Sequence, residues 1–175
     1  FLFDGKGPVC VSEDINLVVA ALNSKPFTYI AELLMPTVSY KCGTVKGIPY
    51  KEPKSTEKVR NLSKTLIEIS KRDYDTNEFS WDFSKLSMID IDSNELELVL
   101  QNQIERNENL VTEVLGLEEE NNKHWIEAYE LEQSIDYSIP INSINLYSNL
   151  SWRFQAKKGK TLSDDDKNGM FLEES

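Results

Sequence analysis

Residues 22–50, LNSKPFTYIAELLMPTVSYKCGTVKGIPY, decide the fold expected for this chain. Ser24 stands before Lys25 and Pro26, and this order predicts a helix start, because a serine hydroxyl accepts from open amides and proline fits the first turn. The apolar residues that follow recur at helical spacing and share one face: Phe27, Ile30, Leu33 and Leu34. Pro36 ends this helix, since proline lacks an amide hydrogen and clashes with the preceding turn.

A short strand is expected directly after Pro36. Val38, Tyr40 and Cys42 alternate with polar residues, which is the periodicity of a strand, and Gly43 ends the run. The stretch therefore predicts a small β element near the N-terminus, preceded by a helix.

Helices are expected on both sides of this stretch. Upstream, Ser12 predicts an N-cap, and the buried face that follows is predicted to hold Ile15, Val18, Val19 and Leu22. Downstream, Ser55 predicts the cap of a helix with a narrow seam of the coiled-coil kind, formed by Val59, Leu62, Leu66 and Ile69.

Two more helices are expected at residues 94–115 and 118–131, with Gly116 ending the first. The first is predicted to turn inward Leu96, Leu100, Ile104, Leu110, Val111 and Val114. The second is predicted to bury Trp125, Ile126 and Tyr129. Upstream of both, Trp81 and Phe83 are expected to be core anchors. The expected fold class is α+β and predominantly α, with long helices packed as a bundle or coiled-coil-like spacer and the small β element near the N-terminus.

Charge is distributed unevenly along the 175 residues, whose net charge of −11 disfavours a free-standing nucleic-acid binder. Residues 1–64 hold nine Lys and Arg against six Asp and Glu, whereas residues 65–140 hold five against nineteen. Phosphate contacts need Lys or Arg near the duplex, because counterion release supplies most of the affinity. The front of the chain is therefore the part expected to touch DNA, if any part does.

The candidate DNA-binding residues are five lysines of the front and one arginine near the end: Lys41, Lys46, Lys51, Lys54, Lys58 and Arg153. The alternative interpretation of the lysines is a solvated face, since no aromatic residue or arginine fork accompanies them. Arg153 stands between Trp152 and Phe154, where it can stack on a base, meet a phosphate, or be buried in a pair with an acid.

Several short motifs resemble adenine-specific DNA methyltransferases of the PglX type, from BREX and phage-growth-limitation systems. The matching segments follow the order of that family: Leu22-Asn23-Ser24-Lys25, Met35-Pro36-Thr37, Ile48-Pro49, Ser80-Trp81-Asp82-Phe83, residues 122–132 and residues 149–154. Met35 stands where the family usually has asparagine, and Leu150 stands where it has proline. The resemblance covers most of the chain.

The resemblance implies the C-terminal region of such an enzyme, cut from a longer chain. Residues 1–53 are then the end of a target-recognition domain, residues 54–140 a helical spacer and residues 141–175 a tail. The implied role is DNA target recognition and structural spacing, while an upstream catalytic domain methylates adenine N6 with S-adenosylmethionine. The implied partners are double-stranded DNA and other subunits of a defence system, with no membrane, in the bacterial cytoplasm.

Neither catalytic residues nor a metal site nor a bound cofactor is predicted for this chain. Amino-methyltransferases present the flipped adenine to an Asn/Asp-Pro-Pro-aromatic turn, and the sequence has no Pro-Pro pair. It also has no Gly-rich loop behind a strand and no His and Cys set with metal spacing. Cys10 and Cys42 are interpreted as reduced thiols.

Two alternatives stay open at this point. The first is a helical interaction module that docks other defence-system subunits through the seams at residues 59–69 and 96–114. The second is a fragment of a type I restriction specificity subunit, whose activity lies in partner chains.

Overall fold

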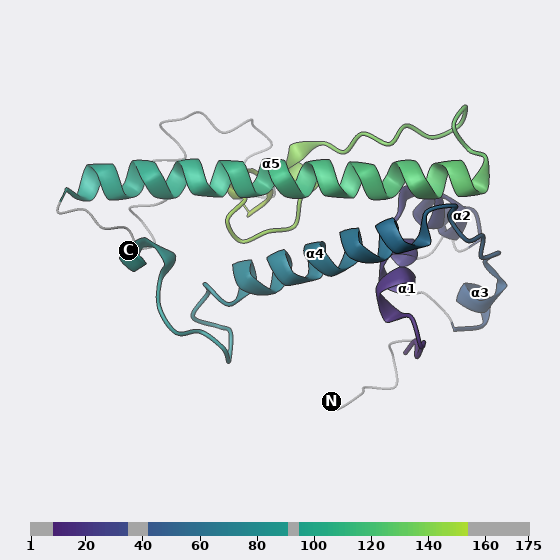
Figure 1. Ribbon diagram of the computed structural model, residues 1–175, viewed down its shortest axis with the longest axis horizontal. Coiled ribbons are helices and arrows are strands. Elements are labelled where there is room, and N and C mark those ends of the chain that lie inside the picture. The colour runs from purple at the N-terminus through teal and green to yellow at the C-terminus, as the bar shows by residue number, and fades with distance from the viewer. Residues whose placement is uncertain (1–8, 35–41, 91–94, 154–175) are drawn as a thin grey trace. The chain divides into compact units, whose positions relative to one another are not determined.

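The computed structural model describes residues 9–34, 42–90 and 95–153, and every regular element in these ranges is helical (Figure 1). The elements are α1 Ile15–Leu22, α2 Lys25–Leu34, α3 Cys42–Gly47, α4 Thr56–Tyr74, η1 Ser87–Asp90, α5 Leu96–Tyr129 and η2 Ile141–Ser143, where η marks a 3-10 helix. The predicted predominance of helix is confirmed. The predicted β element is not supported, because Cys42 begins α3, and the rest of the expected strand lies outside the described residues.

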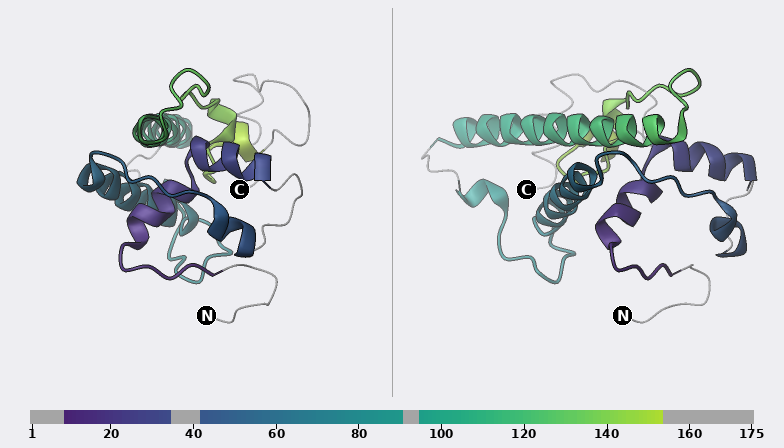
Figure 2. Two further views of the ribbon diagram at one scale, coloured as in Figure 1. Left: turned by 90° about the vertical axis from the view of Figure 1, so that its right-hand side faces the viewer. Right: turned by 45° about the vertical axis from the view of Figure 1, so that its right-hand side comes forward.

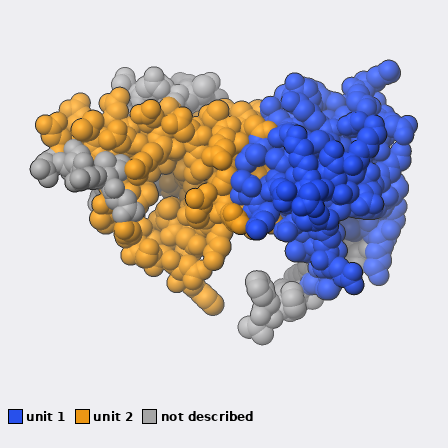
Figure 3. Space-filling view, in the orientation of Figure 1, with its two compact units in different colours: residues 1–65, 117–138 blue, residues 66–116, 139–175 orange. Residues whose placement is uncertain are grey.

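The chain forms two compact units (Figure 3). Unit 1 comprises residues 1–65 and 117–138, and unit 2 comprises residues 66–116 and 139–175. Helices α4 and α5 each contribute residues to both units. The two units follow from contacts in space, whereas the domain boundaries predicted near residues 53 and 140 rest on motifs and charge. The units therefore do not test those boundaries, which stay predictions.

Helix α1 differs from its prediction in its cap and in its buried face. The cap is Asp14, whose carboxylate accepts from the amide of Leu17 at 3.2 Å, whereas the hydroxyl of Ser12 accepts from the amide of Asp14. The buried residues are Leu17, Ala20 and Ala21, while two of the predicted ones, Ile15 and Leu22, are exposed. Small alanine side chains let a helix approach its neighbour closely, which an apolar count from the sequence does not register.

Helix α2 begins as predicted. The amide of Phe27 donates to the hydroxyl of Ser24 at 3.4 Å, so Ser24 is the cap. The helix buries Pro26 and Ala31, whereas Leu33 and Leu34 are exposed and only the first half of the predicted apolar face is covered.

The core of unit 1 gathers around Trp125, whose side chain is completely buried. It clusters with Leu17, Ala20 and Ala21 of α1 and with Val59 of α4, and Tyr129 packs against this cluster. In Figures 1 and 2, α1 and α2 lie beside the C-terminal end of α5, which carries Trp125. The N-terminal helices of the chain therefore pack against this end of α5.

The seam predicted for α4 is confirmed, since Val59, Leu62 and Ile69 are buried and Leu66 is half-buried. On α5, Val111 and Val114 are buried as predicted. Leu100, Ile104 and Leu110 are half-buried, but Leu96 at the start of the helix is exposed, which corrects the prediction there.

Helix α5 is one helix of 34 residues, so the break predicted at Gly116 is wrong. A glycine inside a helix costs about 1 kcal/mol relative to alanine, and this is less than the packing of a long helix supplies. The helix ends instead after Tyr129, where Glu130 has a φ of 59° and the amide of Leu131 donates to the carbonyl of Ile126 at 3.0 Å. This is a Schellman ending, in which the chain reverses.

Replacing Gly116 with alanine is expected to raise the free energy of unfolding by about 0.5–1 kcal/mol, because alanine restricts the unfolded chain and suits the helix. A Cβ atom at this position meets nothing within 4 Å. Urea denaturation followed by circular dichroism measures the gain, and Gly116→Ser is expected to fall between the two. A loss of stability in Gly116→Ala would contradict a continuous helix.

Unit 2 is held together by polar contacts to the segment that follows η2. Asp73, at the end of α4, is buried, and its carboxylate accepts from the amides of Tyr147 at 2.5 Å and Ser148 at 3.0 Å. The amide group of Asn149 donates to the carbonyls of Ile141 and Ile144, each at 2.8 Å. These bonds fix the segment against the end of α4 and against η2.

The turn after α4 contradicts its prediction. Trp81 is fully exposed and Phe83 is half-buried, so neither is the core anchor expected from the sequence. The described hydrogen bonds of the turn are local, and Asp82 pairs with Lys71 at 3.4 Å.

Candidate nucleic-acid interface

The predicted DNA-binding lysines, which we call the lysine strip, lie in or near unit 1. Lys41 falls outside the described residues. Lys46 is exposed in the last turn of α3 and makes no ion pair with any described residue. Lys51 and Lys54 follow in the segment between α3 and α4, and Lys58 lies near the start of α4.

Three lysines of the strip form ion pairs with acids at the C-terminal end of α5. Lys51 lies 3.5 Å from Glu130, Lys54 lies 2.7 Å from Glu127, and Lys58 pairs with Glu120. The hydrogen bond with Glu127 raises the pKa of Lys54 and holds the pKa of Glu127 below its ordinary value.

These pairs are solvent-exposed, and each contributes at most about 1 kcal/mol to stability. Their importance is geometric, because they fasten the segment between α3 and α4 along one end of α5. The structure thus divides the strip into three lysines used inside unit 1 and Lys46, which is open to solvent.

Two adjacent asparagines of α5 join the front to this end of the helix, and sequence reasoning did not assign them this role. Asn121 donates to the carbonyl of Ala20 at 3.0 Å and accepts from the indole of Trp125 at 3.1 Å. Asn122 accepts from the amide of Lys25 at 2.9 Å and donates to the carbonyl of Tyr137 at 3.2 Å. The sequence does contain a signal for this role: two asparagines stand near the predicted buried aromatic residues of a helix, and buried side-chain amides need hydrogen-bond partners.

The exit after α3 is also fixed on α5. The hydroxyl of Tyr129 donates to the carbonyl of Pro49 at 2.7 Å, and the ring of Tyr50 lies 5.8 Å from that of Trp125. The chain is therefore anchored on α5 directly after α3, within four residues of Lys46.

Arg153 belongs to unit 2, whereas the described lysines of the strip belong to unit 1. Its guanidinium lies 5.7 Å from the ring centre of Tyr147, which also contacts the rings of Tyr74 and Trp152. The arginine thus makes a cation–π contact with a tyrosine of its own unit.

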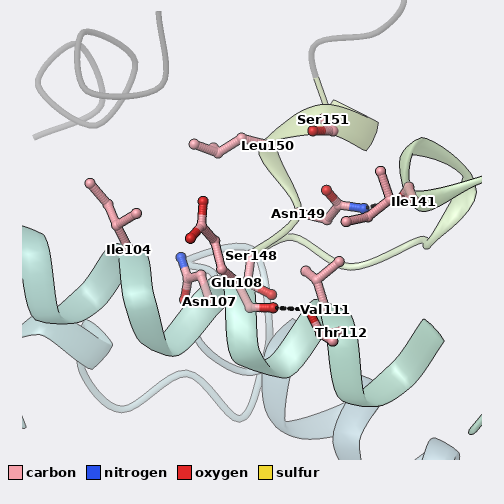
Figure 4. A pocket seen from close by; sticks show the side chains of 10 residues that line it. All are labelled: Ile104, Asn107, Glu108, Val111, Thr112, Ile141, Ser148, Asn149, Leu150 and Ser151. Atoms are coloured by element: carbon pink, nitrogen blue, oxygen red, sulfur yellow. Dashed lines mark hydrogen bonds between the residues drawn. The ribbon is translucent and has the colours of Figure 1, made fainter. Parts of the chain in front are cut away.

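A pocket of about 230 Å³ lies in unit 2 between α5 and the segment after η2 (Figure 4). Its apolar sides come from Ile104 and Val111 of α5, Ile141 of η2 and Leu150 of the segment after η2. The hydroxyl of Ser148, also in the lining, is buried without a hydrogen-bond partner among the described residues. The pocket is smaller than the roughly 300–1,000 Å³ of ordinary ligand sites.

The described residues contain no group of three or more His, Cys, Asp and Glu side chains placed to hold a metal ion. None of the helices in residues 9–34, 42–90 and 95–153 has the length and apolarity that a membrane span requires.

No protein-family model matches the chain. It is 38% identical over 95 residues to the adenine-specific methyltransferase BrxX of Escherichia coli O9:H4 (strain HS), a match over 51% of this chain. It is also 28% identical over 159 residues to the adenine-specific methyltransferase PglX of Lacticaseibacillus casei (strain Zhang), a match over 83% of this chain. The homologues of this chain are BrxX and PglX adenine-specific methyltransferases.

The resemblance found in the sequence motifs is thereby confirmed. The chain spans 8% of the length of BrxX and 13% of that of PglX. The longer of the two matches covers 83% of the chain, so the similarity to PglX extends into both compact units.

Unit 1 of this methyltransferase homologue is expected to lose stability on acidification. Hydrogen bonds from neighbouring side chains hold the pKa of four of its carboxyls below their ordinary values of 3.8 or 4.5: Asp14, Glu120, Glu127 and Asp136. Because the unfolded chain binds protons first as the pH falls, the free energy of unfolding is expected to decrease from about pH 5 downward. Urea denaturation at a series of pH values measures this decrease.

One carboxyl of unit 1 works in the opposite direction, because burial raises the pKa of Glu118. Above the ordinary pKa of a glutamate, the buried ionised form of Glu118 lowers the free energy of unfolding. Glu118→Gln is therefore expected to raise the urea concentration at the midpoint of unfolding at pH 7 and to leave it unchanged at low pH. The double variant Glu120→Gln, Glu127→Gln is expected to flatten the acid side of the profile. Equal midpoints at pH 7 and pH 3 for the unmodified chain would contradict the ion pairs.

Proposed function

We propose that this chain is the C-terminal part of an adenine-specific DNA methyltransferase of a phage-defence or restriction–modification system, where it helps to recognise DNA and spaces the parts of the enzyme. The observation that carries the proposal is the similarity to PglX over 159 residues. Methyl transfer from S-adenosylmethionine to adenine N6 is assigned to the rest of the enzyme, because this sequence has neither a Pro-Pro pair nor a Gly-rich loop behind a strand.

The geometry of unit 1 supports two different roles for the lysines of the strip, internal ion pairing and contact with DNA. Lys51, Lys54 and Lys58 hold the front against α5 through their ion pairs. Lys46 is exposed on a helix whose C-terminal exit is anchored on α5, which suits a contact with a DNA phosphate. Lys41 and Arg153 stay sequence-based candidates for such contacts.

Lys46→Ala in the full-length methyltransferase is expected to weaken duplex binding by a similar factor on all sequences. The salt dependence of binding is expected to lose about one unit of slope, because one phosphate contact fewer releases fewer counterions. Fluorescence anisotropy at several salt concentrations measures both quantities. Arg72→Ala is the matched control, since it removes an exposed positive charge from unit 2. Unchanged affinity and slope in Lys46→Ala would overturn the assigned contact.

A docking module for other defence-system subunits is the second candidate. The seams expected to dock such subunits are already covered, because Val59, Ile69, Val111 and Val114 are buried within the chain. What favours docking is a different feature, two exposed aromatic side chains of unit 2. Duplex binding that is absent even at low salt would favour this candidate over DNA contact.

A further inference from the structure

Two aromatic side chains of unit 2 lie in solvent at the turn after α4. Trp81 is fully exposed, at 103% of its reference area, and Phe79 is 83% exposed. Tryptophan and phenylalanine dominate the energetics of protein interfaces, because each removes a large apolar surface from water when it is covered. We call residues 75–83 the aromatic turn.

The aromatic turn is held in shape by hydrogen bonds of its own. The hydroxyl of Ser80 donates to Asp75 at 2.7 Å and accepts from the amide of Asp82 at 3.2 Å. The amide of Phe79 donates to the side chain of Asn77 at 3.0 Å. A turn fixed in this way loses little conformational entropy when a partner covers it, which favours binding.

The charge of the turn restricts the partner. Residues 73–84 carry four acids and no base, but Asp73 is buried and Asp82 pairs with Lys71, so Asp75 and Glu78 give the turn its negative charge. This charge repels DNA phosphates, and it repels the same turn of a second copy. A surface that covers the two rings is therefore expected to be an apolar pocket with lysine or arginine at its rim.

We propose that the aromatic turn docks Trp81 and Phe79 into an apolar, basic-rimmed pocket on the part of the methyltransferase outside this chain. This inference rests on the proposed function, in which the chain is one part of a longer enzyme. The homologues leave room for such a pocket, since the chain matches 8% of BrxX and 13% of PglX.

Hydroxyl-radical footprinting of the full-length protein, without DNA, tests the docking. Trp81 is expected to be oxidised severalfold more slowly in the folded protein than in urea, at every protein concentration used. Equal rates in the two states would overturn the proposal, and so would protection that disappears on dilution, because that outcome indicates a second copy. Since DNA is absent, loss of the function assigned to Lys46 leaves this result unaffected.

Two pairs of variants test the residues themselves. Trp81→Ala is expected to raise the oxidation of Phe79, whereas Ile89→Ala, which shortens another exposed apolar side chain of unit 2, is expected to leave it unchanged. Glu78→Lys is expected to raise the oxidation of Trp81, whereas Glu105→Lys, the same charge change on an exposed position of α5, is not. An unchanged rate of Trp81 oxidation in Glu78→Lys would contradict a basic rim on the proposed pocket.

Discussion

Replacing Trp125 with alanine is expected to lower the free energy of unfolding by about 3–5 kcal/mol, the largest effect of any single change in unit 1. The side chain is completely buried, it forms the centre of the cluster with α1 and α4, and its indole donates to Asn121. Its removal leaves a cavity and an unpaired amide oxygen. Urea denaturation of the chain, followed by circular dichroism, measures the loss.

Two control variants separate the parts of this effect. Trp125→Phe keeps a ring in the cluster but removes the indole donor, so a smaller loss is expected. Trp81→Ala removes the same kind of side chain from a fully exposed position and is expected to change the stability of the chain by less than about 0.5 kcal/mol. Similar losses in Trp125→Ala and Trp81→Ala would contradict the described burial.

Replacing Asp73 with alanine is expected to destabilise unit 2 by about 3–5 kcal/mol. Its buried carboxylate accepts from two backbone amides, and each bond to a charged group contributes about 1.5–3 kcal/mol. The variant leaves the amides of Tyr147 and Ser148 without their acceptor. Hydrogen exchange at these two amides and urea denaturation measure the effect together.

Asp73→Asn is expected to lose less than Asp73→Ala, because one acceptor oxygen remains. Glu68→Ala, at an exposed position of the same helix, is the matched control and is expected to be neutral within about 0.5 kcal/mol. Wild-type exchange rates at Tyr147 and Ser148 in Asp73→Ala would show that the carboxylate does not hold this segment.

Local sequence predicted the elements whose causes are local. Ser24 caps α2, the seam of α4 is buried, and Trp125 and Ile126 face the core, because capping and helical spacing act within a few residues. Gly116 misled the prediction, since the local cost of a glycine is small beside the packing of a long helix.

The remaining errors concern contacts between distant residues. Trp81 has the composition of a core residue, yet no rule of spacing states whether another element covers it. The lysine strip has the composition of a phosphate-binding surface, yet three of its members face acids more than 60 positions further along the chain, at Glu120, Glu127 and Glu130. Which charge neutralises a lysine is decided by tertiary structure, so these partners were not predictable from the sequence.

Unit 1 is assembled from two stretches of sequence, residues 1–65 and 117–138, with about fifty residues of unit 2 between them. During synthesis, the front therefore leaves the ribosome well before the helix end that completes it, and it has to wait for Asn121, Asn122 and Trp125. The same discontinuity governs the engineering of chimeras. A graft of residues 1–65 from a homologue has to bring its own residues 117–138, because either stretch alone would meet a mismatched counterpart.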